Sequence, residues 1–221
     1  MKFLLAMLFF AAPVVAETNL RIAIAGDSTV AEYGDKTTQR GWGQYIQWYF
    51  RDSVQVSNLA KGGRSTKTFL NEGLWAKSLA VKPDVILIQF GHNDSHDPKQ
   101  PEATNAAGDY ADYLRNFVDE ARAAGAVPVL ITPVQRRTKV DSLLPYADAM
   151  RAVATEKQVA LIDLHGSSGK LYGELGEAAT AELEANAKDR THFNEKGARA
   201  IAALVMKELV EIDPRLKKEL R

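Results

Sequence analysis

The amino-acid sequence predicts an α/β fold in which helices cover both faces of a parallel β-sheet. Short apolar runs, suited to buried strands, recur along the chain, and stretches with helical periodicity lie between them. Of the 221 residues, 46% are hydrophobic and 25% are charged, as in soluble globular proteins. No repeat or linker interrupts the alternation, so we expect a single domain over residues 17–221.

The first 16 residues, MKFLLAMLFFAAPVVA, have the pattern of a cleavable signal peptide. Lys2 precedes an apolar run, and the small residues Val14 and Ala16 stand where a signal peptidase reads. The apolar run is shorter than the roughly 20 residues that a spanning helix needs. We therefore expect cleavage after Ala16, export to the periplasm or beyond, and no stable insertion into a membrane.

Five apolar segments are predicted to be strands, at residues 20–25, 54–59, 84–90, 127–132 and 159–164. The third, DVILIQF, has the strongest pattern, because Pro83 precedes it and Gly91 ends it. A parallel arrangement with both faces covered accounts for their nearly continuous apolar character.

Helices are predicted at residues 109–124, 146–157 and 196–212, where apolar side chains recur on one face. Asn194 is the expected N-cap of the last helix. The aromatic-rich segment 42–50 is also predicted to be helical, with Tyr45, Trp48 and Tyr49 in the core.

Composition excludes several classes of function. The chain has no cysteine, which excludes disulfides, thiolate metal sites and a cysteine nucleophile. Lys and Arg together number 28, as do Asp and Glu, and this balance argues against nucleic-acid binding. Asp94, His96 and Asp97 lack a matching second group of ligands, so we expect no metal site and no cofactor. A monomer is expected.

Polar residues gather where the predicted strands end. Four clusters follow strands or precede the last helix: Gly26-Asp27-Ser28-Thr29, Gly62-Gly63-Arg64-Ser65, Gly91-His92-Asn93-Asp94 and Asp189-Arg190-Thr191-His192. In open α/β sheets, sites lie beyond the carboxyl ends of the strands. The fold would therefore bring these clusters together.

Together these residues suit ester hydrolysis through a serine nucleophile. His192 can take the proton of Ser28, and Asp189, three residues earlier, can orient the imidazole. Backbone N–H groups of Ser28 and Gly63, with the Asn93 amide, can stabilise an oxyanion. Each cluster alone is better explained as a turn or a helix cap. Their joint occurrence, in this order at strand ends, favours the catalytic interpretation.

On these residues the chain resembles the SGNH (GDSL-type) hydrolases, whose blocks supply Ser, Gly, Asn and His in that order. GDST, the Gly-Arg-Ser turn and DRTHFNEKGA are most similar to the rhamnogalacturonan acetylesterase branch, carbohydrate esterase family 12. The resemblance implies a flavodoxin-like three-layer sandwich with five parallel strands. It implies Ser28, Asp189 and His192 as catalytic residues and Ser28, Gly63 and Asn93 as the oxyanion hole. Thr29 stands in place of the Leu of GDSL.

The substrate is less sharply indicated. Arg64, Arg136 and Arg137 lie in loops on the catalytic rim, and we hypothesise that they attract a uronate-containing polysaccharide such as pectic rhamnogalacturonan. A solvated basic loop explains the same residues equally well. His92 either shapes the substrate pocket or satisfies backbone groups.

Three alternatives to a pectin acetylesterase remain open at this point. One is an acetylxylan or oligosaccharide acetylesterase. Another is a periplasmic thioesterase or lysophospholipase, although the polar, Gly-rich loops favour a small acyl group. The last is a carbohydrate-binding protein that has lost catalysis.

Overall fold

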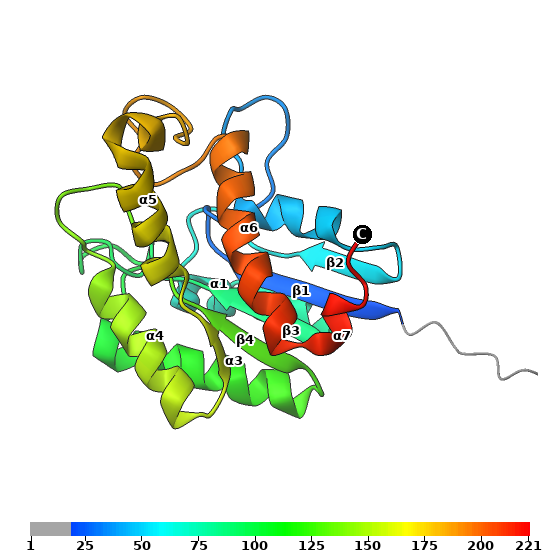
Figure 1. The fold of residues 1–221 in the computed structure, drawn as a ribbon. Helices are drawn as coiled ribbons and strands as arrows, with labels where there is room; N and C mark the ends of the chain where they lie inside the picture. Colours follow the sequence, from blue (N-terminus) through cyan, green and yellow to red (C-terminus); the bar gives the residue numbers. More distant parts are fainter. Residues whose placement is uncertain (1–18) are drawn as a thin grey trace, which may run out of the picture.

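A five-stranded parallel sheet lies between two layers of helices in the computed structural model, which describes residues 19–221 (Figure 1). The predicted signal peptide and its cleavage site after Ala16 lie outside the described residues. The strands are β1 (Leu20–Gly26), β2 (Val54–Asn58), β3 (Val85–Gln89), β4 (Val127–Ile131) and β5 (Ala160–Ile162). The three-layer sandwich predicted from the sequence is confirmed.

The strand order is β2-β1-β3-β4-β5, and every neighbouring pair is parallel. Ile24 of β1 is paired with Asn58 of β2 on one side and with Leu87 of β3 on the other. The chain therefore adds β2 to one side of β1 and all later strands to the other. Such a reversal opens a crevice at the carboxyl ends of β1 and β3, where ligands bind in folds of this class.

Two separate cores form because alternate residues of a strand point to opposite faces of the sheet. Ile22 and Ile24 of β1 pack in one buried cluster, and Ala23 and Ala25 pack in the other. The first cluster is covered by η1 (Trp42–Tyr49), α5 (Leu164–Ala181), α6 (Glu195–Ile212) and α7 (Pro214–Lys217). The second is covered by α1 (Thr66–Asn71), α2 (Leu74–Ala80), α3 (Ala111–Ala123) and α4 (Leu144–Glu156).

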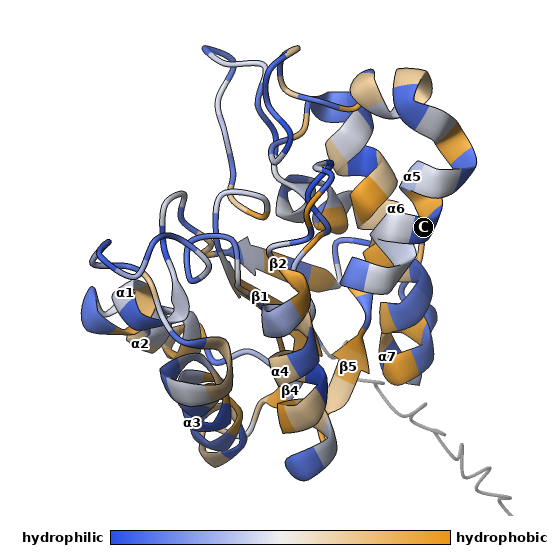
Figure 2. Ribbon diagram, turned by 90° about the vertical axis from the view of Figure 1, so that its left-hand side faces the viewer, coloured by the Kyte–Doolittle hydropathy of each residue, from blue (hydrophilic) through white to orange (hydrophobic). Residues whose placement is uncertain are grey.

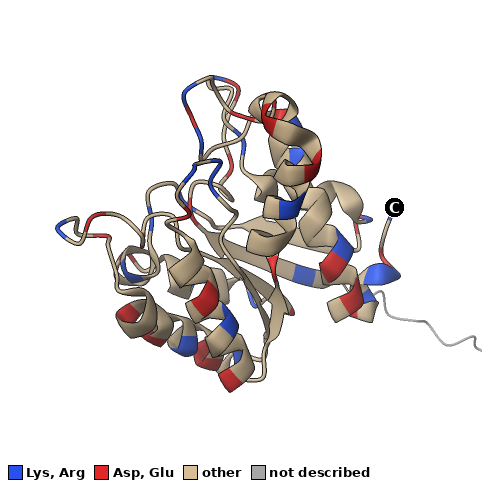
Figure 3. Ribbon diagram, turned by 60° about the vertical axis from the view of Figure 1, so that its left-hand side comes forward, with Lys and Arg blue, Asp and Glu red and all other residues tan. Residues whose placement is uncertain are grey.

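Polarity follows these layers. The strands are largely hydrophobic, whereas hydrophilic residues gather on the outer helical faces and in the loops (Figure 2). Lys, Arg, Asp and Glu occur mainly on the helices and in the loops that follow the carboxyl ends of the strands (Figure 3). No helix among residues 19–221 has the length and apolar character to cross a bilayer.

Element boundaries differ from the sequence predictions in ways that have local causes. A π-helical turn, η2 (Ala106–Tyr110), precedes α3, and Gly108 within it has non-helical dihedral angles, so the regular helix starts at Ala111. Helices α1, α2, α5 and α7 were not predicted. Asn194 caps α6 as predicted, because its side chain accepts a hydrogen bond from the N–H of Gly197.

The prediction that Trp48 lies in the core is wrong. Its side chain is 55% exposed, whereas Tyr45 is buried and Tyr49 is half-buried. Trp48 lies at the rim of the core, where α6 presents Arg199 instead of an apolar residue. The Arg199 guanidinium lies 4.4 Å from the Trp48 ring centroid, so a cation–π contact replaces core packing.

Candidate active site

Ser28 lies in a tight turn directly after β1. The N–H groups of Val30 and Ala31 both donate to the carbonyl of Asp27, at 3.2 and 3.0 Å, which closes the turn around Ser28. A Cβ atom on Gly26 would lie 2.9 Å from the carbonyl oxygen of Gln89, so a larger residue would push β1 from β3 at this point. The turn therefore fixes the Ser28 hydroxyl at the crevice.

His192 and Asp189 meet Ser28 from the segment before α6. The Nε2 atom of His192 lies 2.9 Å from the Ser28 Oγ, and its Nδ1 lies 2.9 Å from the Asp189 Oδ2. The other Asp189 oxygen accepts the backbone N–H groups of Thr191 and His192, at 2.9 and 2.8 Å. With Asp189 ionised, Nδ1 carries the proton and Nε2 is the base that faces the hydroxyl.

The environment of Asp189 favours its charged form. Partial burial by itself would raise the pKa of the carboxyl, but the backbone N–H groups of His192 and Thr191 and the His192 ring outweigh that effect. The pKa of Asp189 is therefore held below its usual value. The carboxylate stays ionised at neutral pH and can stabilise an imidazolium.

Three N–H groups are candidates for an oxyanion hole: the backbone N–H groups of Ser28 and Gly63 and the Asn93 side-chain amide. A Cβ atom on Gly62 would lie only 3.6 Å from the Ser28 Cβ, so the Gly62-Gly63 turn packs against the serine. Among residues 19–221, no acceptor takes the backbone N–H of Ser28 or Gly63. The Asn93 amide nitrogen donates to the Arg64 carbonyl at 3.0 Å and has a second hydrogen to offer. Gly63 has a φ of +76°, a backbone conformation that favours glycine.

His92 is buried in the protein interior, where it pairs with Asp27, the residue before Ser28. Its side chain is almost fully buried, and its Nδ1 lies 3.1 Å from the Asp27 Oδ2. Burial alone would raise the pKa of Asp27, but His92 and the hydrogen bonds from Thr29 lower it below the usual value. The pair joins the turn that carries Ser28 to the turn that carries Asn93. The structure thus gives His92 a contact inside the protein and no surface to present to a polysaccharide.

Asp94 is a second buried carboxylate close to the site. Its Oδ1 accepts the hydroxyls of Thr66 and Thr104, at 2.6 and 3.0 Å, and the N–H of Thr66 at 3.1 Å. These donors are neutral, so burial dominates and raises the pKa of Asp94 to about 7. Asp94 thereby ties the start of α1 to the turn that holds Asn93. His96 instead pairs with Glu102 at 2.6 Å.

The three arginines proposed to attract substrate lie in different environments. Arg64 pairs with Glu72 at 3.0 Å and is partly exposed. The Arg136 guanidinium donates to the His92 carbonyl at 2.9 Å and to the Ser142 hydroxyl at 2.8 Å. The Arg137 side chain is only 4% exposed and pairs with Glu184 at 3.2 Å.

Among the residues that the structure describes, no group of three His, Asp or Glu side chains is placed to hold a metal ion.

Arg137 and Glu184 form a buried clamp on the segment that carries the His192–Asp189 pair. The Arg137 guanidinium donates to the carbonyl oxygens of His192 at 2.9 Å and of Asp189 at 3.4 Å. It also lies 4.8 Å from the Phe193 ring centroid, and Glu184 has a second partner in Arg190. Sequence reasoning missed Glu184, because nothing in its local sequence distinguishes it from other acidic residues of a charged segment.

The chain is similar to known proteins over most of its length. Residues 24–200 match the GDSL-like Lipase/Acylhydrolase family. The chain belongs to this family. As a GDSL-like acylhydrolase it is a carboxylic ester hydrolase.

Relatives of this GDSL-like hydrolase include two proteins of Bacillus subtilis (strain 168). The probable rhamnogalacturonan acetylesterase YesY is 40% identical over 201 residues, which cover 86% of this chain and 93% of YesY. The rhamnogalacturonan acetylesterase RhgT is 36% identical over 223 residues, which cover 91% of this chain and 94% of RhgT. Both similarities extend over nearly the whole length of the relative.

Solved structures of the same fold include Bacillus subtilis YxiM, with a TM-score of 0.77 and 31% identity. That similarity covers 88% of this chain and 57% of YxiM. Axe2, an acetylxylan esterase from Geobacillus stearothermophilus, has a TM-score of 0.70 at 20% identity and covers 87% of this chain. At 20% identity the similarity to Axe2 concerns the fold alone.

Proposed function

We propose that this protein is an exported serine esterase that removes acetyl groups from acetylated rhamnogalacturonan. The observation that carries the proposal is the chain of contacts Ser28–His192–Asp189, with 2.9 Å at each of its two side-chain steps. The two relatives of similar length that are named rhamnogalacturonan acetylesterases support the substrate.

The first half of the proposed reaction forms an acetyl-enzyme. His192 Nε2 removes the Ser28 proton as Oγ attacks the acetyl carbonyl, and the carbonyl oxygen becomes an oxyanion. The N–H groups of Ser28, Gly63 and Asn93 stabilise that charge. The imidazolium, paired with Asp189, then gives its proton to the sugar oxygen as the carbon–oxygen bond of the ester breaks.

The second half returns the enzyme to its starting state. A water molecule takes the place of the sugar, His192 removes one of its protons, and the resulting hydroxide attacks the acetyl-serine. A second oxyanion collapses and the bond to Ser28 Oγ breaks. His192 returns its proton to Ser28 and acetate leaves, so one water is consumed for each ester cleaved.

The polar character of the crevice supports a small acyl group. The Ser28 carbonyl accepts the Tyr33 hydroxyl at 2.9 Å, the Ser28 Oγ faces His192, and the open hollow beside His192 is lined by polar side chains and not by an apolar groove. A short acetyl group needs no such groove, whereas a long acyl chain would gain its binding energy from one.

Acetate release tests the proposed function. The substrates are acetylated rhamnogalacturonan, acetylated xylan and a long-chain p-nitrophenyl ester, each with the natural protein and with Ser28→Ala. We expect release from rhamnogalacturonan that Ser28→Ala abolishes. Release only from xylan, or only from the long-chain ester, would reject the substrate and retain the serine mechanism.

A serine-directed organophosphate separates an enzyme from a binding protein. Stoichiometric labelling of Ser28, found by peptide mass spectrometry, is expected of an enzyme. An unlabelled serine together with retained polysaccharide binding would instead favour a carbohydrate-binding protein on this fold.

Export has its own test, because it rests on residues 1–16 alone. We expect the exported protein to begin at Glu17 when its N-terminus is sequenced. An exported chain that still begins at Met1 would contradict the proposed cleavage.

A further inference from the structure

Five buried side chains form a continuous chain of hydrogen bonds that the proposed reaction does not use. The Trp42 Nε1 donates to the Gln89 Oε1 at 2.9 Å, and the Gln89 Nε2 donates to the Thr29 Oγ1, also at 2.9 Å. The Thr29 hydroxyl donates to the Asp27 Oδ1 at 2.8 Å, and the Asp27 Oδ2 lies 3.1 Å from the His92 Nδ1. Each of these residues is at most 2% exposed, so water does not compete for the bonds.

The direction of every bond in this chain is fixed by its first member. An indole N–H can only donate, so the Gln89 amide turns its oxygen to Trp42 and its nitrogen to Thr29. The Thr29 hydroxyl accepts from Gln89 and gives its own proton to Asp27. Asp27, whose pKa is lowered, is ionised and can only accept. The His92 Nδ1 therefore carries the proton that joins the last two residues.

His92 uses only one of its two ring nitrogens in a hydrogen bond. Its Nδ1 bonds Asp27, whereas its Nε2 is buried and has no hydrogen-bond partner within residues 19–221. The imidazole thus contributes one donor to the interior. An Asn side chain, whose amide nitrogen can take the place of Nδ1, could supply the same bond.

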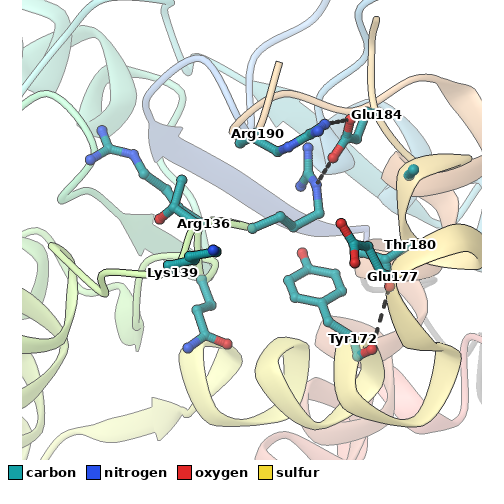
Figure 4. Close-up of a pocket in the computed structure, with 11 residues that line it drawn as sticks. Arg136, Lys139, Tyr172, Glu177, Thr180, Glu184 and Arg190 are labelled. Carbon is teal, nitrogen blue, oxygen red and sulfur yellow. Dashed lines mark hydrogen bonds and ion pairs between the residues drawn. The ribbon is translucent and has the colours of Figure 1, made fainter. Parts of the chain in front are cut away.

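Other contacts hold the turn that carries Asn93 to more distant elements. The Arg136 guanidinium donates to the His92 carbonyl at 2.9 Å, and Figure 4 shows this side chain pointing away from the Tyr172 ring. Asp94, on the other side of Asn93, bonds the start of α1. These contacts tie the turn to α1 and to the loop after β4.

The His92–Asp27 pair alone among these contacts links the turn to the nucleophile, because it joins the residue before Asn93 to the residue before Ser28. Asp27 has further bonds from the N–H and the hydroxyl of Thr29, at 2.9 and 2.8 Å. Loss of the His92 side chain would therefore leave the Ser28 turn in place. The turn that carries Asn93 would be free to move relative to it.

We propose that His92 and Asp27 are positioning residues that set the place of the Asn93 amide relative to the Ser28 hydroxyl. Both side chains are buried, so they act through Asn93 and do not touch the substrate. An oxyanion donor is effective only if it is held about 2.7–3.1 Å from where the charged oxygen will lie. The inference deepens the proposed function and rests on its serine mechanism, whichever polysaccharide is the substrate.

A kinetic test compares two substitutions of His92 on p-nitrophenyl acetate. His92→Leu removes the bond to Asp27 and should lower kcat about 10- to 100-fold with little change in KM. His92→Asn keeps a donor and should stay within about threefold of the natural protein. His165→Leu is the matched control, because His165 is also a buried histidine, paired with Asp141 at 3.1 Å. We expect His165→Leu to change kcat less than about threefold.

A double-mutant cycle separates positioning from a loss of stability. Asn93→Ala lacks the amide that His92 is proposed to position. Adding His92→Leu to Asn93→Ala should therefore lower kcat by less than about threefold. The same 10- to 100-fold loss in both backgrounds would overturn the proposal, because independent effects add.

NMR tests the linkage without turnover. The side-chain NH₂ signals of Asn93, assigned by their absence in Asn93→Ala, should shift or broaden in His92→Leu and stay in place in His165→Leu. In the natural protein, long-range ¹H–¹⁵N spectra, assigned with His92→Asn, should show a proton on the His92 Nδ1. This second measurement applies even if His92→Leu does not fold. A proton on Nε2 only, or Asn93 signals that His92→Leu leaves unmoved, would overturn the proposal.

The outcomes separate this inference from the proposed function. If Ser28→Ala still hydrolyses p-nitrophenyl acetate at the natural rate, the serine mechanism is rejected, whereas Asn93 signals that depend on His92 support the linkage between the two turns. Hydrolysis that depends on Ser28 but is unaffected by His92→Leu retains the serine mechanism and overturns the positioning role.

Discussion

Replacing Arg137 by Met tests whether the buried clamp positions the catalytic histidine. Met fills a similar volume against Phe193 and Tyr172 but removes the guanidinium that bonds Glu184 and the His192 carbonyl. Glu184 keeps its ion pair with Arg190, and the His192 carbonyl keeps the hydrogen bond from the N–H of Ala185. We therefore expect a loss of about 3 kcal/mol in unfolding free energy, at the lower end for a broken buried ion pair.

The effect on catalysis should exceed what stability alone explains. The clamp holds the backbone between Asp189 and His192, and a displacement of about 1 Å at a catalytic group lowers the rate about 100-fold. We expect kcat on p-nitrophenyl acetate to fall about 10- to 100-fold while KM changes little. Arg137→Lys keeps the charge but cannot reach all three acceptors, so it should recover only part of the loss.

Urea unfolding and steady-state kinetics at 20 °C measure both quantities. The control is Arg115→Met, which breaks an exposed pair with Glu156 and should cost less than about 1 kcal/mol without altering kcat. If Arg137→Met is destabilised but retains the kcat of the natural protein while folded, the clamp does not position His192 and the reasoning is refuted.

Three further predictions concern the carboxylates and the oxyanion hole. Asp94 has its folded pKa raised to about 7, above the unfolded value, so its contribution to stability is complete below about pH 4 and lost as pH rises through 7. That difference in pKa corresponds to about 4 kcal/mol of unfolding free energy. Urea unfolding of the natural protein from pH 4 to 8 should show an unfolding free energy that falls with pH, and Asp94→Asn should lack this contribution. Equal pH slopes in the two proteins would contradict the prediction. Asp189→Asn should lower kcat about 10⁴-fold because the amide cannot stabilise the His192 imidazolium, and a loss below tenfold in pre-steady-state assays would argue against the pair. Asn93→Ala should lower kcat about 100- to 1000-fold, while Ser28 remains open to organophosphate labelling; an unchanged kcat would remove Asn93 from the oxyanion hole.

The sequence alone predicts the five strands in their order along the chain and the polar clusters at their ends. Buried parallel strands are apolar on both faces, so their pattern appears in any five-residue window, and Pro83 and Gly91 delimit β3 directly. Ser28, Gly63, Asn93, Asp189 and His192 were named for the same reason: each follows a strand or precedes a helix. Short helices such as α1 and α2 were missed because six or seven residues hold too little periodicity.

Only the tertiary structure decided what the charged residues near the site do. Arg64, Arg136 and Arg137 look alike in sequence, yet Arg64 is partly exposed, Arg136 bonds a backbone carbonyl, and Arg137 is buried against Glu184. For Arg136 and Arg137 the partners His92 and Glu184 lie 44 and 47 positions away, and local sequence carries no record of contacts at such distances. The pairing of Asp27 with His92 and the neutral donors around Asp94 likewise exist only where loops from different strands meet.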